Sequence, residues 1–92
     1  MMSTIEKSVT VCNELGFHAR AAAVFVRLST TFDCDIQVSC REGQVDGKSI
    51  MGVMMLAAAK GAEITIHAEG TDAEEAVAQL STLVENRFGE EK

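Results

Sequence analysis

The 92-residue sequence predicts an α+β domain in which three helices pack on one face of a four-stranded, mostly antiparallel sheet. Two observations predict this class. Apolar residues alternate between a two-residue and a 3.6-residue period along the chain, in the order β-α-β-β-α-β-α. The length allows one modest core, so we expect a single domain over residues 1–92 with its core between about 5 and 88.

The first half of the sequence contains three predicted strands and one predicted helix. Alternation of apolar and polar residues places the strands at 5–11, 35–40 and 44–46. A tight turn at 41–43 joins the last two into a hairpin. Between the first strand and the hairpin, a helix begins at His18 or Ala19 and keeps an apolar stripe to about Thr31.

The second half of the sequence predicts a short helix, a strand and a longer helix. Ser49 suits the N-cap of the short helix, which extends to Ala58. The strand at 63–69 alternates most clearly, with its apolar residues facing the core. Thr71 and Glu74 match a capping box at the start of the last helix. Gly89 ends that helix, and we expect the acidic residues after it to be frayed.

Composition excludes several classes of function. The net charge is −6 with only eight Lys and Arg residues, which argues against a nucleic-acid partner. No apolar run approaches the roughly 20 residues that span a bilayer, and nothing at the N-terminus resembles a signal peptide, so we expect a cytoplasmic protein without membrane insertion.

The sequence pattern assigns no reaction or ligand to the cysteines or to one of the two histidines. The three cysteines match neither a disulfide framework nor a zinc pattern, so we expect them to be reduced and expect no metal site. We expect His67 to be solvated on the outer face of its strand.

His18 and Arg20 lie where the irregular segment gives way to the first helix. The free N–H groups and the positive end of the dipole favour an anion at such a position. A neutral imidazole is also a competent nucleophile toward phosphorus. His18 is therefore a candidate phosphoryl acceptor, and the alternative is a helix-capping histidine beside a solvated arginine.

The segment 43–49 resembles a nucleotide-binding P-loop, but it is one residue short and no apolar parallel strand precedes it. We therefore do not expect a nucleotidase. The short helix that follows is apolar on most sides, with more apolar residues than one buried face uses. Adaptable methionine side chains suit a surface that docks partners, and we favour Met51 and Met54 for that role, although a core stripe is the alternative.

Two motifs together resemble the HPr family, the histidine-containing phosphocarriers of the bacterial phosphoenolpyruvate:sugar phosphotransferase system. They are Gly16-Phe17-His18-Ala19-Arg20-Ala21-Ala22-Ala23 and Lys48-Ser49-Ile50-Met51-Gly52-Val53-Met54-Met55-Leu56. The resemblance extends from Val9 to about Val84 and implies the open-faced β-sandwich of that family. It implies no cofactor and a stoichiometric carrier rather than an enzyme.

The resemblance also implies roles for individual residues. His18 is the phosphoryl acceptor, through Nδ1; it takes the group from phospho-enzyme I and passes it to enzyme IIA domains. Arg20 matches the active-site arginine. Ser49 matches the serine that an HPr kinase/phosphorylase modifies. The residues expected to contact partners are Phe17, Ala21, Arg27, Lys48, Ile50, Met51 and Met54.

Two functions remain open at this point. The first is phosphoryl transfer through His18, with docking to enzyme I by a basic patch of Arg20, Arg27 and Lys48 together with the methionine surface. The second is a mainly regulatory module, controlled by phosphorylation of Ser49 and bound by a kinase or a transcription regulator. We expect a monomer in either role. Ala21 replaces the proline that the family usually has after the arginine, which loosens the His18 loop and adds one N–H donor.

Overall fold

A computed structural model of the chain describes residues 3–41 and 43–92, with four strands and three α-helices in the predicted order. The strands are β1 (Ser3–Thr10), β2 (Asp35–Cys40), β3 (Gly43–Asp46) and β4 (Glu63–Gly70). The helices are α1 (Ala19–Ser29), α2 (Ile50–Met55) and α3 (Ala73–Glu85), followed by a 3-10 turn, η1 (Arg87–Gly89). Within these two ranges, no helix is both long and apolar enough to cross a membrane.

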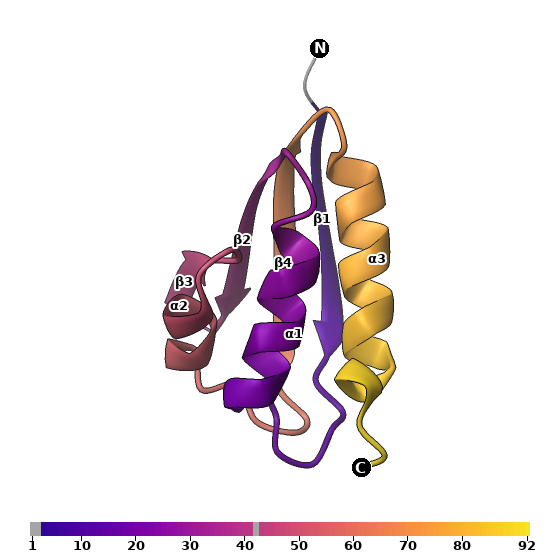
Figure 1. Cartoon of the computed structure of the whole chain (residues 1–92). Helices are drawn as coiled ribbons and strands as arrows, with labels where there is room; N and C mark the ends of the chain where they lie inside the picture. Colours follow the sequence, from indigo (N-terminus) through magenta and orange to yellow (C-terminus); the bar gives the residue numbers. More distant parts are fainter. Residues whose placement is uncertain (1–2, 42) are drawn as a thin grey trace.

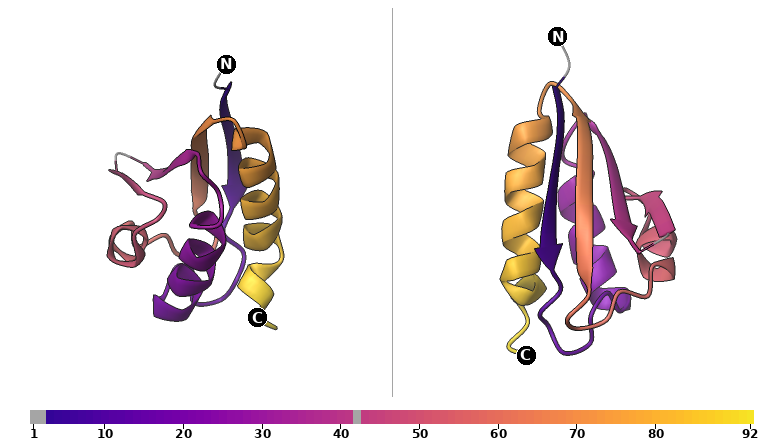
Figure 2. Two further views of the ribbon diagram at one scale, coloured as in Figure 1. Left: turned by 45° about the horizontal axis from the view of Figure 1, so that its top comes forward. Right: turned by 180° about the vertical axis from the view of Figure 1, so that it is seen from behind.

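All four strands form one sheet in the order β1-β4-β2-β3, and each neighbouring pair is antiparallel. The helices lie on one face of this sheet, and the view from behind shows the other face uncovered (Figures 1 and 2). This arrangement is an open-faced sandwich, so the predicted fold class is confirmed. The predicted turn at 41–43 includes Glu42, which lies outside the described residues.

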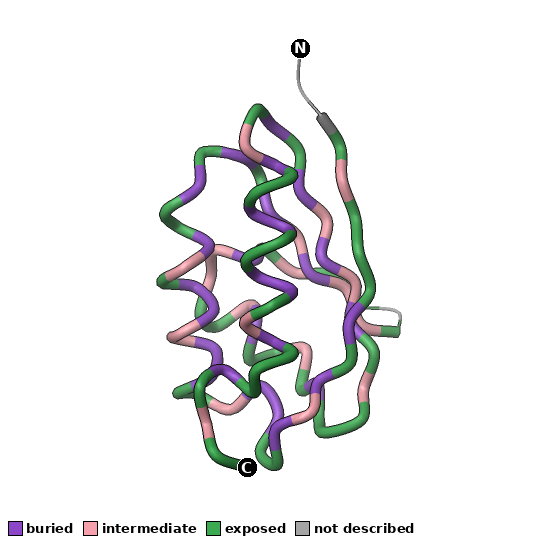
Figure 3. The backbone as a smooth tube through the Cα atoms, turned by 90° about the vertical axis from the view of Figure 1, so that its right-hand side faces the viewer, coloured by how far each residue is buried: buried purple, intermediate pink, exposed green. Residues whose placement is uncertain are grey.

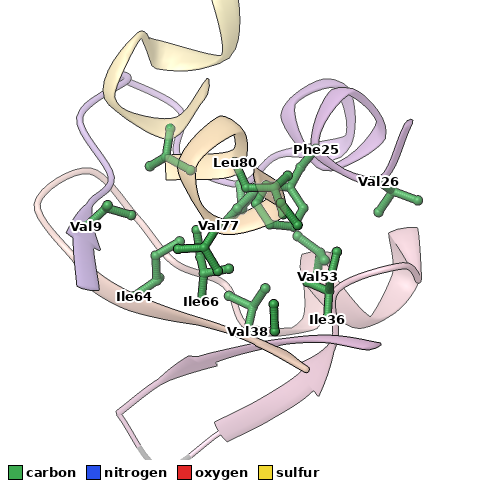
Figure 4. Close-up of a cluster of buried hydrophobic side chains, with 14 of the residues drawn as sticks. Val9, Phe25, Val26, Ile36, Val38, Val53, Ile64, Ile66, Val77 and Leu80 are labelled. Atoms are coloured by element: carbon green, nitrogen blue, oxygen red, sulfur yellow. The ribbon is translucent and has the colours of Figure 1, made fainter. Parts of the chain in front are cut away.

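The core lies between the sheet and the helices. Buried residues alternate with more exposed ones along β2 and β4, and buried residues recur every three or four residues along α1 and α3 (Figure 3). Ile64, Ile66 and Ala68 of β4 are buried, as their alternation predicted. Phe25 of α1 and Leu80 of α3 contribute fully buried side chains from the helix side (Figure 4). The apolar periods of strand and helix thus meet in one cluster.

The outer face of the sheet carries polar side chains that bond across strands. His67 lies on this face, as expected, but it is not simply solvated. Its Nδ1 lies 2.9 Å from Glu6 Oε2 on β1, and its Nε2 lies 3.0 Å from Ser39 Oγ on β2. Glu6 is the register partner of His67, and β2 lies on the other side of β4. The sheet therefore brings together three residues that are far apart in the sequence.

The start of α3 differs from the prediction. Its N-cap is Asp72 rather than Thr71, and no side chain makes a capping hydrogen bond, so the capping box with Glu74 is wrong. The Asp72 carboxylate instead accepts hydrogen bonds from the backbone N–H groups of Asp33 (2.8 Å) and Cys34 (2.9 Å). Chiefly the hydrogen bond from Asp33 holds the pKa of the Asp72 carboxyl below its ordinary value of 3.8. The Asp72 side chain thus binds the backbone of a segment distant in sequence instead of capping its own helix.

This bridge predicts an acid-dependent loss of stability. Because folding lowers the pKa of Asp72, its contribution to the free energy of unfolding is present above the unfolded-state pKa and is lost as pH falls through the folded value. We expect Asp72→Asn to be less stable than wild type at pH 7, and the difference to shrink as the pH is lowered from 7 to 2, once it falls below the ordinary carboxyl value. Urea unfolding across this range measures it.

The matched control is Asp33→Asn, which removes an exposed carboxylate from the segment that Asp72 binds but keeps the Asp33 N–H donor. Its stability difference from wild type should stay small at every pH. A gap between Asp72→Asn and wild type that is as large at pH 2 as at pH 7 would contradict this account of the bridge.

Candidate functional site

The segment between β1 and α1 is fastened to the segment between α2 and β4. Val11 N donates to Ala62 O at 2.8 Å, and Phe17 N donates to Ala58 O at 3.0 Å. Gly16 permits this close approach, because its φ is +62° and a Cβ there would lie 2.3 Å from Ala58 O. These contacts fix the backbone that leads directly into His18.

Phe17 anchors this segment in the core and is not available for docking. Its ring packs edge-on against Phe25, with centroids 5.4 Å apart, and lies 4.9 Å from the ring of Phe88. Phe17 is buried, and Ala21 in the first turn of α1 is fully buried. Both were expected to contact partners, and burial contradicts that expectation. Both belong to the hydrophobic core, Phe17 through its contacts with Phe25 and Phe88, and Ala21 through the buried face of α1.

His18 is the N-cap of α1, so the helix begins at Ala19, one of the two predicted start positions. Its backbone is extended, and Ala22 N donates the first helical hydrogen bond to His18 O at 2.9 Å. The N–H groups of Ala19, Arg20 and Ala21 precede that bond and have no partner within the helix. The His18 side chain makes no capping bond of its own. His18 therefore directly precedes N–H groups that have no partner within the helix, at the positive end of the helix dipole.

The imidazole of His18 contacts a carboxylate from the far end of the chain. Its Nε2 lies 2.6 Å from Glu90 Oε2, and the other oxygen, Oε1, accepts a hydrogen bond from Asn13 Nδ2 at 2.9 Å. Burial opposes ionisation of Glu90, but the hydrogen bonds from Asn13 and His18, aided by the charge of Arg20, hold the pKa of its carboxyl below the ordinary value of 4.5. Glu90 is therefore an anion at neutral pH.

Asn13 and Glu90 are site residues that sequence reasoning missed. Asn13 is fully buried and also donates to Gly16 O at 2.9 Å, so it joins the loop to the tail. The C-terminal residues were expected to be frayed, which is wrong for Glu90. Its backbone N–H donates to Arg87 O at 2.9 Å, and the buried ring of Phe88 holds the tail against the core. The available signal was an apolar residue, Phe88, among the polar residues at the end of the chain.

The cations expected to form one basic patch lie apart. Lys48 Nζ donates to Phe32 O at 2.7 Å, beyond the C-terminal end of α1. Arg20 is in the first turn of α1 and Arg27 in the last, which separates them by roughly 10 Å along the helix axis. Both arginines are exposed. The structure therefore distributes these charges along α1 and past its end rather than gathering them in a compact patch.

Ser49 caps α2, and most of the apolar side chains of that helix face outward. Ser49 Oγ accepts a hydrogen bond from Gly52 N at 3.0 Å, as its predicted N-cap role requires. Only Val53 of the helix is buried. The exposed apolar residues, here called the α2 surface, are Ile50, Met51, Met54 and Met55. Met51 is 74% exposed, so the prediction of an exposed methionine surface is confirmed.

No group of three or more His, Cys, Asp or Glu side chains within residues 3–41 and 43–92 gathers in a way that would hold a metal ion. All three cysteines are free. The chemistry available at the N-terminus of α1 is therefore that of an imidazole, a guanidinium, backbone donors and one carboxylate.

Comparisons with known proteins point to one family. Residues 5–86 match the family described as PTS HPr component phosphorylation site. The chain is 49% identical over 83 residues to phosphocarrier protein HPr of Pseudomonas aeruginosa, covering 89% of this chain and 92% of that protein. It is 45% identical over 86 residues to phosphocarrier protein HPr of Cupriavidus necator, covering 94% of this chain and 97% of that protein.

A solved structure agrees with these relatives. The crystal structure of HPr-C-His from Thermoanaerobacter tengcongensis superposes with a TM-score of 0.91 at 41% identity, covering 96% of this chain and 99% of that one. Similarity in sequence and in three dimensions thus extends over nearly the whole chain.

The approach of Gly16 to Ala58 generates a stability prediction. Gly16→Ala adds a methyl group where the carbonyl oxygen lies 2.3 Å away, so the Phe17 N–Ala58 O bond must break or lengthen. We expect a loss of at least about 2 kcal/mol beyond the strain of a positive φ, and shifted amide resonances around His18. Denaturant unfolding and amide NMR measure the two effects.

Gly61→Ala is the matched control, because Gly61 also has a positive φ (+91°) but a Cβ there would meet nothing within 4 Å. It should lose only about 1 to 2 kcal/mol and leave the His18 resonances in place. Equal losses in the two variants would show that the close approach at Gly16 does not matter.

Proposed function

This chain belongs to the HPr family of the phosphotransferase system, and we propose that His18 accepts a phosphoryl group from phospho-enzyme I and passes it to enzyme IIA domains. The observation that carries this proposal is the position of the imidazole at the N-cap of α1, next to three backbone donors without helical partners. In this role the protein is a stoichiometric carrier rather than an enzyme. It uses no cofactor and works as a monomer in the cytoplasm.

The site supports acceptance of a phosphoryl group on the Nδ1 atom of His18. The His18 side chain is 27% exposed, and Nδ1 has no hydrogen-bond partner among the described residues. Its lone pair is therefore free to attack phosphorus. The N–H groups of Ala19, Arg20 and Ala21 and the guanidinium of Arg20 then stabilise the negative charge of the bound group.

The α2 surface supports a docking role beside this site. Helices α1 and α2 lie side by side on the same face of the sheet (Figure 1). Flexible methionine side chains adapt to different partners, which suits a carrier that meets both a donor and several acceptors. Arg27, exposed in the last turn of α1, adds a positive charge to the helix that lies beside α2. We propose that enzyme I and the IIA domains share this surface.

A second function concerns regulation through Ser49. Its hydroxyl is partly exposed at the N-cap of α2 and next to the α2 surface. Phosphorylation there by an HPr kinase/phosphorylase would place a dianion next to the docking residues, which discourages acidic partners and recruits basic ones, such as a transcription regulator. Acid-stable phosphate on Ser49, without transfer from His18 to any IIA domain, would favour regulation as the main role.

We expect His18→Ala to abolish labelling of the protein by phosphoenolpyruvate and enzyme I. Wild type should take up one acid-labile, base-stable phosphoryl group, since a phosphoramidate hydrolyses in acid. His67→Ala is the control, because it removes the other histidine, on the outer face of the sheet, and should label like wild type. Equal labelling of His18→Ala and wild type would reject the proposed acceptor.

We expect Met51→Glu to weaken binding to enzyme I by roughly tenfold or more, because it places a charge in the centre of an apolar contact. Calorimetric titration at two salt concentrations measures this loss and its electrostatic part. Thr82→Glu adds the same charge to an exposed position of α3 and should change affinity by less than about twofold. Unchanged affinity in Met51→Glu would remove the α2 surface from the docking site.

A further inference from the structure

The contact between Glu90 and His18 is not used by the proposed transfer, although it joins a carboxylate to the reacting ring. We propose that Glu90 is a positioning residue that keeps a proton on Nε2, directs the phosphoryl group to Nδ1, and stabilises the positive ring formed when that group is bound. This inference rests on the proposed function and identifies a residue outside the His18 motif that shapes its chemistry.

Hydrogen-bond chemistry selects the nitrogen that reacts. An ionised carboxylate only accepts hydrogen bonds, so the 2.6 Å contact to Glu90 Oε2 requires a proton on Nε2 of His18. In the neutral ring the other nitrogen, Nδ1, is then the one with a lone pair. The depressed pKa of the Glu90 carboxyl keeps it ionised, and therefore an acceptor, at neutral pH.

The balance of the transfer step shows why the charge matters. As the bond from Nδ1 to phosphorus forms, the bond from phosphorus to the donor breaks, and the donor's leaving group departs with that electron pair. The Nε2 proton stays in place, so the ring becomes a phosphorylated imidazolium. On onward transfer the phosphorus–Nδ1 electron pair returns to the ring, which leaves as neutral imidazole rather than as an anion.

A carboxylate 2.6 Å from Nε2 stabilises that positive ring in the same way that the aspartate of a serine-protease triad stabilises its imidazolium. A phosphoryl group on Nδ1 would also repel Glu90, but the ring would separate it from the carboxylate. We expect the attraction to the ring to dominate, because the carboxylate contacts the ring directly, whereas the phosphoryl charge is more distant and is offset by the N-terminal donors of α1 and by Arg20. Glu90 should therefore favour the phosphorylated form.

The conformation of the C-terminal turn holds the Glu90 carboxylate next to His18. Arg87 and Phe88 both have positive φ, +59° and +55°, a conformation that costs free energy for residues other than glycine. Burial of the Phe88 ring against Phe17 offsets that cost. Asn13 then holds the second oxygen of Glu90, so both ends of the carboxylate are fixed. The backbone of Arg87 and Phe88, the packing of the Phe88 ring and the hydrogen bond from Asn13 together fix the position of the Glu90 side chain.

Glu90→Gln tests the proposal, since it removes the charge and keeps the size of the side chain. Glu91→Gln is the matched control, because it removes the same charge from the adjacent, exposed residue. We expect the equilibrium constant for phosphoryl transfer from enzyme I to fall roughly tenfold or more in Glu90→Gln and to stay within about twofold of wild type in Glu91→Gln. Both variants should have similar thermal midpoints.

Proton NMR of the unphosphorylated protein gives a second, independent readout. The His18 Nε2–H resonance should be observable and slow to exchange in wild type and Glu91→Gln, and lost to exchange in Glu90→Gln. An unchanged equilibrium constant in Glu90→Gln overturns the proposal, as does a protected Nε2–H that survives the substitution. Failure of wild type to accept phosphate would instead reject the proposed function, while the exchange measurement would still decide whether Glu90 holds the Nε2 proton.

Discussion

The ring of Phe17 packs between Phe25 of α1 and Phe88 of the C-terminal turn, and the site depends on this contact. It holds the residue before His18 in the core, so the imidazole must emerge at the first turn of the helix. It also seats the turn that carries Glu90. The C-terminal turn thereby meets the start of α1, which is distant in sequence, and the aromatic contacts hold the two segments together.

The backbone that leads into the reacting groups is tightly packed. Gly16 and Ala58 are in close backbone contact, Asn13 is fully buried, and α1 begins at a fixed residue. By contrast, α2 has six residues and buries only Val53. A rigid acceptor beside an adaptable docking surface suits a carrier, because the transfer geometry must stay constant while the partner changes.

Much of the fold was predictable from local patterns. The two-residue period located β2 and β4 closely, and the side chain of Ser49 forms the N-cap bond that its sequence position suggested. Where the prediction failed, the side chain makes a hydrogen bond to a distant segment rather than the local interaction that its sequence position suggested. Asp72 bonds to the backbone before β2 instead of leaving the cap to Thr71, and Lys48 reaches the carbonyl of Phe32 instead of standing free beside the arginines.

Patterns within a few residues were enough to establish the element order, the place of His18 at a helix N-terminus and the exposed methionines of α2, because spacing and propensity act locally. Long-range packing was needed to show that Phe17 and Ala21 are buried and that Glu90 meets His18. That contact joins residues 72 positions apart, and no local period encodes it. It arises because the Phe88 ring fits the core and turns the chain back toward the imidazole.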